Sequence, residues 1–163
     1  MLSDIPKGWT SIIVDLPDMA ETICKDATRM FRVLIGLTSV SDSLNGYWGK
    51  YDVQDCQEAA TILADKKYID GNRVAIRGGS AGAYTTLSSV TFAPSPTLYK
   101  TACGAYGCVA DVQHLTDVTE KFEMRYCYTL FASAPSGGAW DPRNPIDHAS
   151  NIKVPLLVCG ALL

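Results

Sequence analysis

The sequence predicts an α/β fold in which helices flank a mostly parallel sheet. Strand-like apolar runs alternate with helix-like segments along the chain, and a glycine-rich turn joins a compact strand directly to a helix. The length of 163 residues fits one domain, and 47% hydrophobic with 19% charged residues is the composition of a globular protein with a core.

The expected elements follow from periodicity and turn signals. Strands are expected at residues 11–16, 31–37, 73–77, 101–106 and 154–160, and helices at 18–30, 52–66, 81–91 and near 117–128. The helix at 52–66 has the clearest pattern, because its apolar residues recur on one face. These residues are Val53, Cys56, Ala59 or Ala60, and Leu63.

Composition argues against several classes of partner. A net charge of −3 gives no sign of a nucleic-acid or membrane-surface partner, both of which favour clustered Lys and Arg. No apolar run is long enough to span a bilayer and no signal peptide is visible, so a cytoplasmic protein is expected. Six scattered cysteines are expected to be free thiols, and no pairing suits zinc: Cys24, Cys56, Cys103, Cys108, Cys127 and Cys159.

Residues 78–82 read Gly-Gly-Ser-Ala-Gly, which fits the G-x-S-x-G nucleophile elbow. In this motif Ser80 sits on a sharp strand-to-helix turn, and Gly78 and Gly82 avoid side chains that would collide there. The Ala81 N–H, at the start of the helix, can stabilise an oxyanion. An ordinary glycine-rich turn and a phosphate-binding loop are the alternatives, although the Gly-Lys-Ser/Thr ending of a Walker loop is missing.

Several further segments, in the right order, resemble one family. They are residues 44–49 (LNGYWG), 52–56 (DVQDC), 76–82 (IRGGSAG), 121–126 (KFEMRY), 143–148 (RNPIDH) and 154–157 (VPLL). Together they are similar to the catalytic domain of the prolyl oligopeptidase (S9-type) family of serine peptidases. The dipeptidyl-peptidase-like and acylaminoacyl-peptidase-like members are the most similar. Ala83 departs from the pattern, since the family more often has a second glycine there.

The resemblance implies a partial α/β-hydrolase fold over residues 44–163, with residues 1–43 unassigned. It also implies peptide-bond hydrolysis through Ser80, with a peptide substrate and no cofactor or metal. The family's triad Asp and His are expected beyond residue 160, so both should be absent from this chain. An apparently truncated chain of this kind should have little or no peptidase activity.

The remaining histidines and acidic residues are not expected to replace the triad. His114 and His148 precede the expected Asp, so the family's chain order argues against either as the base. Asp111, Asp117 and Asp147 are likewise not assigned as the triad acid, and a helix cap or turn is the expected role of Asp111.

Two other functions stay open at this stage. One is an esterase or lipase on the same fold, because the elbow alone does not separate ester from peptide hydrolysis. The other is a non-catalytic pseudoenzyme or interaction module, favoured by the missing triad residues. An exposed edge along the strand at 154–160 would also invite self-association with another chain.

Overall fold

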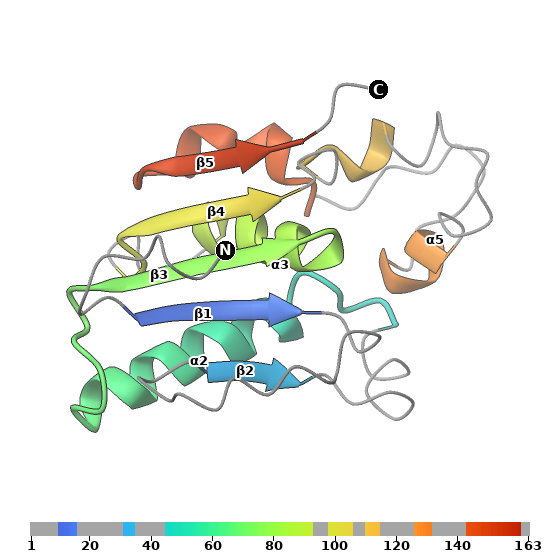
Figure 1. Cartoon of the computed structure of the whole chain (residues 1–163). Coiled ribbons are helices and arrows are strands. Elements are labelled where there is room, and N and C mark those ends of the chain that lie inside the picture. The colour runs from blue at the N-terminus through green and yellow to red at the C-terminus, as the bar shows by residue number, and fades with distance from the viewer. Residues whose placement is uncertain are drawn as a thin grey trace.

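The structure of the protein is a computed structural model. It describes residues 10–15, 31–34, 45–92, 98–105, 110–114, 126–131 and 143–160. Five strands run parallel in the order β2-β1-β3-β4-β5 (Figure 1). They are β1 (Thr10–Asp15), β2 (Phe31–Leu34), β3 (Val74–Gly79), β4 (Thr101–Ala105) and β5 (Leu156–Cys159). Parallel neighbours require crossover connections, which places every carboxyl end at the same edge of the sheet.

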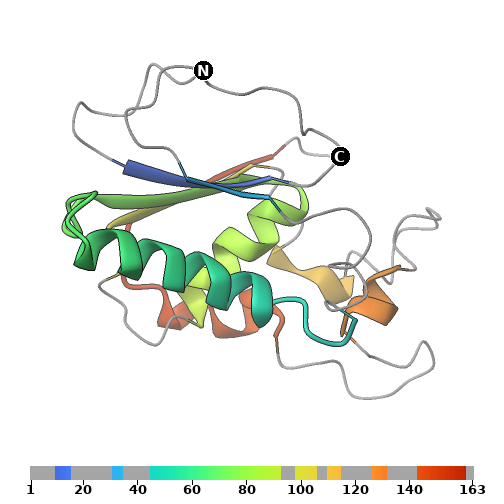
Figure 2. The same ribbon diagram turned by 90° about the horizontal axis from the view of Figure 1, so that it is seen from below.

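The helices of the described part of the chain lie on one face of this sheet (Figure 2). The main ones are α2 (Tyr51–Asp65), α3 (Ala81–Thr91) and the 3₁₀ helix η4 (Pro145–Asn151), while the short α5 (Tyr126–Phe131) lies beyond the carboxyl ends of the strands. Residues 112–114 are also helical. All eleven residues of α3 are buried. The helix therefore forms the centre of the packing between the sheet, α2 and η4.

The α/β prediction with a parallel sheet is confirmed, and most expected elements agree with the structure to within two residues. The strand expected at 73–77 instead extends through both glycines to Gly79. Of the helix expected near 117–128, the described residues show only its last part, as α5. The helix expected at 18–30 lies outside the described residues, and η4 was not predicted. Within the described ranges, no helix is both long and apolar enough to cross a bilayer.

Alternation along β3 separates a buried face from an open one. Val74 and Ile76 point toward the helices and are fully buried, whereas Ala75 and Arg77 on the other face are half-buried. The buried pair packs against the predicted apolar face of α2, including Cys56, Ala60 and Leu63. Burial also raises the pKa of the Cys56 thiol to about 12, so this cysteine stays protonated as a small core side chain.

Asp52 joins α2 to α3 through a buried carboxylate. It lies in the first turn of α2 with 2% of its surface exposed. One oxygen accepts the Gly49 N–H at 2.7 Å, and the other accepts the Thr85 hydroxyl of α3. Because burial disfavours the charged form, the pKa of Asp52 is raised, although the hydrogen bonds from Thr85 and Gly49 oppose this shift.

Replacing Asp52 should separate the role of its hydrogen bonds from that of its charge. Asp52→Ala leaves two buried donors without their acceptor, and we expect a loss of about 2–4 kcal/mol in the free energy of unfolding. Asp52→Asn keeps the shape: its amide oxygen can accept the Gly49 N–H, and its amide nitrogen can donate to the Thr85 oxygen with the direction of that bond reversed, so its loss should be within about 1 kcal/mol at pH 7. Urea denaturation of both variants measures the difference, and equal losses would contradict the hydrogen-bonding role.

The pH dependence of the same variant tests the raised pKa. The folded state binds the Asp52 proton more tightly than the unfolded chain, where the ordinary pKa is 3.8. Stability from this group is therefore present at acid pH and is lost as pH rises from 3.8 through the raised pKa. Urea denaturation of wild type and Asp52→Asn should give a difference (wild type minus variant) that falls over this interval. A rising difference would show that the pKa is depressed instead.

Candidate active site

Ser80 occupies the turn between β3 and α3. The strand ends at Gly79 and the helix begins at Ala81, so Ser80 is the only residue between them. Its backbone has φ 53° and ψ −125°, a conformation that residues with a side chain rarely adopt and that costs about 1–3 kcal/mol. The side chain is exposed at the carboxyl edge of the sheet. Backbone strain and exposure together are the geometry that the elbow motif requires.

Backbone hydrogen bonds hold Ser80 on both sides. Its N–H donates to the Ala105 carbonyl of β4 at 3.1 Å. Its own carbonyl accepts the N–H groups of Ala83 at 2.8 Å and of Tyr84 at 3.2 Å. The strained residue is thereby fixed by the neighbouring strand and by the first turn of α3.

Gly78 allows the strand and the helix to approach each other at the turn. A Cβ at this position would lie within 3.0 Å of the carbonyl group of Gly82, and also within 3.0 Å of Thr86 Oγ1. Backbone atoms cannot move aside as the end of a side chain can, so Gly78 is required by close packing. The contact explains the glycine two residues before the serine in the motif.

Ala81 supplies the first backbone N–H of α3. The first N–H groups of a helix have no carbonyl partner within the helix, and they carry the positive end of its dipole. Ala81 follows Ser80 directly, so this N–H lies next to the exposed serine hydroxyl. An oxyanion formed on an acyl group attached to Ser80 could therefore be stabilised here.

An aromatic cluster packs behind the turn, formed by Trp48, Tyr84 and Phe131. The ring centroids of Trp48 and Tyr84 are 4.3 Å apart, and Phe131 meets Tyr84 edge-on at 5.5 Å. Ala81 at the start of α3 belongs to the same buried cluster. Gly49 permits the contact, because its φ is +78° and a Cβ there would collide with the Tyr84 hydroxyl.

Arg143 connects the segments around this aromatic cluster. Its guanidinium donates to the carbonyls of Trp48 and Phe131, and it lies 5.2 Å from the centre of the Phe131 ring. Its own carbonyl accepts the Tyr84 hydroxyl at 3.0 Å. The side chain is 6% exposed, so these bonds form in a nearly dry environment. The sequence placed Arg143 in a family-like segment but suggested no role for it.

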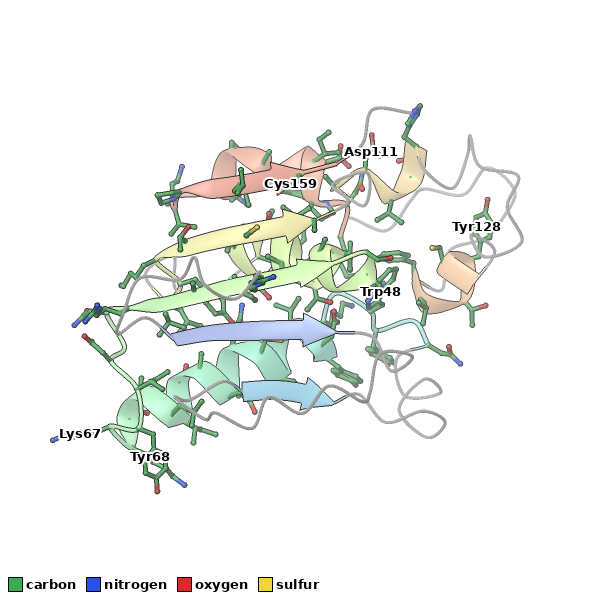
Figure 3. All side chains as sticks on the ribbon, viewed as in Figure 1. Trp48, Lys67, Tyr68, Asp111, Tyr128 and Cys159 are labelled. Carbon is green, nitrogen blue, oxygen red and sulfur yellow. The ribbon has the colours of Figure 1, made fainter. Side chains whose placement is uncertain are left out.

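Asn144 connects the next residues along the chain to the helical turn at 111–114, in which residues 112–114 are α-helical. Its side-chain oxygen accepts the Val112 N–H at 2.9 Å, and its amide donates to Asp111 at 3.2 Å and to Asp147 at 3.1 Å. Asp111 also accepts the His114 N–H at 3.0 Å, so the prediction of a cap or turn role for Asp111 is confirmed. In Figure 3, Asp111 and Trp48 lie beyond the carboxyl ends of the strands, whereas Lys67 and Tyr68 lie at the opposite edge.

The two histidines differ in their position relative to Ser80. His148 packs edge-on against the Phe92 ring, with centroids 5.3 Å apart. Phe92 follows the last residue of α3 and Ser80 precedes the first, so the length of the helix, roughly 16 Å, separates them. His114 lies at the serine's edge of the sheet, on the turn whose Val112 packs in the cluster with Ala81. Among the described residues, His114 donates its backbone N–H to Asp111 and His148 packs on Phe92. Neither of these contacts involves the Ser80 hydroxyl.

Gly78 and its register partner Gly104 on β4 offer a matched pair of substitutions. Gly78→Ala should reduce the free energy of unfolding by about 3 kcal/mol or more, because its Cβ meets backbone atoms of Gly82. Gly104→Ala should change it by no more than about 1 kcal/mol, since its Cβ would meet side chains at an ordinary 3.7 Å. Urea denaturation compares the two, and similar effects would contradict the packing role of Gly78.

Comparison with known proteins agrees with this geometry. The sequence model of the prolyl oligopeptidase family matches residues 19–163. Among curated relatives, the acylamino-acid-releasing enzyme of Arabidopsis thaliana is 28% identical over 120 residues, which is 71% of this chain and 16% of that enzyme. The chain thus spans about a sixth of the length of the curated relatives it matches.

Solved structures show the same arrangement of elements. A puromycin-hydrolyzing peptidase of Mycobacterium tuberculosis is similar with a TM-score of 0.74 and 28% identity, covering 93% of this chain and 25% of that one. A puromycin hydrolase is 34% identical with a TM-score of 0.66, over 78% of this chain and 19% of that one. The acylaminoacyl peptidase of Pyrococcus horikoshii, with a TM-score of 0.71 and 17% identity, shows the shared fold.

The parallel sheet is therefore part of an α/β-hydrolase fold, as the sequence predicted. The family match covers well over half of the chain and includes the strained serine turn. This chain belongs to the prolyl oligopeptidase family of serine peptidases.

Proposed function

We propose that Ser80 is the nucleophile of a serine-type peptidase site that hydrolyses peptide bonds. The observation that supports this most directly is the exposed serine with a left-handed backbone, held between β3 and the start of α3. A structural serine at a strand-to-helix junction gains nothing from such strain. Strained conformations of this kind concentrate at functional sites.

The reaction that fits this geometry is acyl transfer to water. The Ser80 oxygen attacks the peptide carbonyl carbon as its proton passes to a base, which gives a tetrahedral intermediate. The Ala81 N–H stabilises the negative oxygen of that intermediate. Collapse releases the amine, and water then hydrolyses the acyl-enzyme. Gly78 and Gly82 serve the reaction indirectly, by holding the turn that positions both groups.

The base is the component that the described residues do not bring to Ser80. His148 is separated from the serine by the length of α3, whereas His114 lies at the same edge of the sheet. A serine hydroxyl without a base stays protonated near pH 7, and removing triad members lowers turnover by about 10⁴–10⁶. Turnover by the chain alone is therefore expected to be slow, and the lack of a histidine bonded to Ser80 among the described residues favours a non-catalytic module as the second candidate.

The names of the relatives support a substrate class for this proposal. Their names describe release of acylamino acids and hydrolysis of puromycin, both of which involve an amide next to an amino acid. An aminoacyl or acyl-aminoacyl amide is accordingly the proposed substrate. Peptide chemistry is favoured over simple esters because the family-like segments extend well beyond the elbow itself.

A fluorophosphonate probe tests the proposal without requiring turnover. The probe phosphonylates an activated serine and mimics the tetrahedral intermediate, so the elbow and the Ala81 N–H should favour its reaction at Ser80. Because the described residues bring no base to Ser80, we expect labelling to be slow, but peptide mass spectrometry should find the adduct on Ser80 ahead of all other serines and find none there in Ser80→Ala. His114→Ala should slow labelling at least tenfold if His114 acts as the base, and should leave it unchanged otherwise.

Absence of labelling would overturn the proposed activity for this chain. Far-UV circular dichroism must show that the protein is folded, and the Ser80→Ala variant gives the background. A folded, unlabelled protein would support the non-catalytic module. Where Ser80 is labelled, aminoacyl amides and short acyl esters offered side by side would separate a peptidase from an esterase.

A further inference from the structure

Two cysteines meet on the open face of the sheet, opposite the helices. Cys103 on β4 is in register with Leu157 on β5, and Ala105 is in register with Cys159. Register partners in a parallel sheet point to the same face, so Cys103 and Cys159 are diagonal neighbours on it. The neighbouring Cys159 thiol also contributes to the raised pKa of the Cys103 thiol.

The two thiols differ in accessibility. Cys159 is exposed and Cys103 is half-buried, whereas Cys56 and Cys127 are buried in the core. Burial raises the pKa of the Cys103 thiol, although Arg77, its register partner on β3, opposes the shift. An exposed thiol beside a partly buried one is the arrangement in which the first reacts with a small molecule and the second completes the exchange.

We propose that Cys103 and Cys159 form a redox-sensitive dithiol that closes to a disulfide with a low-molecular-weight disulfide such as oxidised glutathione. The Cys159 thiolate attacks one glutathione sulfur, which forms a mixed disulfide and releases one glutathione. The Cys103 thiolate then attacks Cys159 sulfur and releases the second. Two protein thiols are oxidised and one glutathione disulfide is reduced to two glutathiones, so electrons and protons balance.

Closing the bond requires a small movement of β5. Diagonal neighbours in a sheet have Cα atoms roughly 7–8 Å apart, whereas a disulfide seldom spans more than about 6.8 Å. The end of β5 must therefore shift by about 1 Å. In the described part of the sheet this strand pairs with β4 alone, and Leu157, Val158 and Cys159 are exposed, so few contacts oppose the shift.

The movement reaches the serine turn through one residue. Ala105 is the register partner of Cys159, and its carbonyl accepts the Ser80 N–H at 3.1 Å. The shift of Cys159 pulls on its register partner Ala105, and a displacement of Ala105 weakens the hydrogen bond that fixes the strained turn. If Ser80 acts as proposed above, oxidation should slow its reaction with a fluorophosphonate probe by about fivefold, the effect of losing one ordinary hydrogen bond.

The disulfide itself is tested on the reduced, folded 163-residue protein treated with oxidised glutathione. Free thiols are then alkylated, and the protein is digested with trypsin without reduction. Cys159 falls on the peptide 154–163 and Cys103 on the peptide 101–121, which also contains Cys108. We expect these two peptides to be linked in wild type and in Cys108→Ser, and not in Cys103→Ser or Cys159→Ser.

Three results would overturn the dithiol. They are a link that disappears in Cys108→Ser, glutathione retained on Cys159 without a link, and failure of both cysteines to react. Labelling of Ser80 before and after oxidation then tests the connection to the turn, with Cys103→Ser as the control that cannot close. Equal labelling in both states would overturn that connection. Labelling in neither state would count against the proposed peptidase function. The linked peptides would still show whether Cys103 and Cys159 form a disulfide.

Discussion

The close approach of Gly78 to Gly82 is the constraint on which the rest of the site depends. A strand and the helix that follows it normally need several connecting residues, because side chains keep the two apart. Here a single residue, Ser80, connects them, since Gly78 has no Cβ to push away the carbonyl group of Gly82. The strain of that short connection is concentrated in Ser80, and it turns the serine side chain out of the sheet.

A strained backbone conformation persists only where the surrounding contacts stabilise it by more free energy than the strain costs. On the sheet side, the Ala105 carbonyl takes the Ser80 N–H. On the helix side, α3 is buried along its whole length, so it cannot rotate or slide to relieve the turn. The buried Asp52 adds a further connection by bonding α3 to the start of α2. The conformation of one residue is thus stabilised by the packing of the entire helical face.

Elements that depend on local patterns could be predicted from the sequence, and those that depend on distant contacts could not. The helix α2 has its apolar residues at helical spacing, and the serine turn has glycines at fixed offsets from Ser80. Arg143 has no such local signal, because its bond to the Trp48 carbonyl joins residues 95 apart in the chain. Nor could the pair Cys103 and Cys159 be recognised, since it exists only through the register of β4 with β5.

The serine turn is built by local geometry, whereas the contacts of Arg143 behind it join segments that are distant in the sequence. The turn positions Ser80, the proposed nucleophile, and the Ala81 N–H by local geometry, and the glycine motif between a strand and a helix was enough to predict where both lie. The aromatic cluster and the carbonyl bonds of Arg143 instead bring the turn at 45–50, α5 and α3 together behind the serine. The guanidinium of Arg143 binds the first two segments and its backbone carbonyl binds Tyr84 of α3, so one buried residue supports the start of α3, where the Ala81 N–H would act.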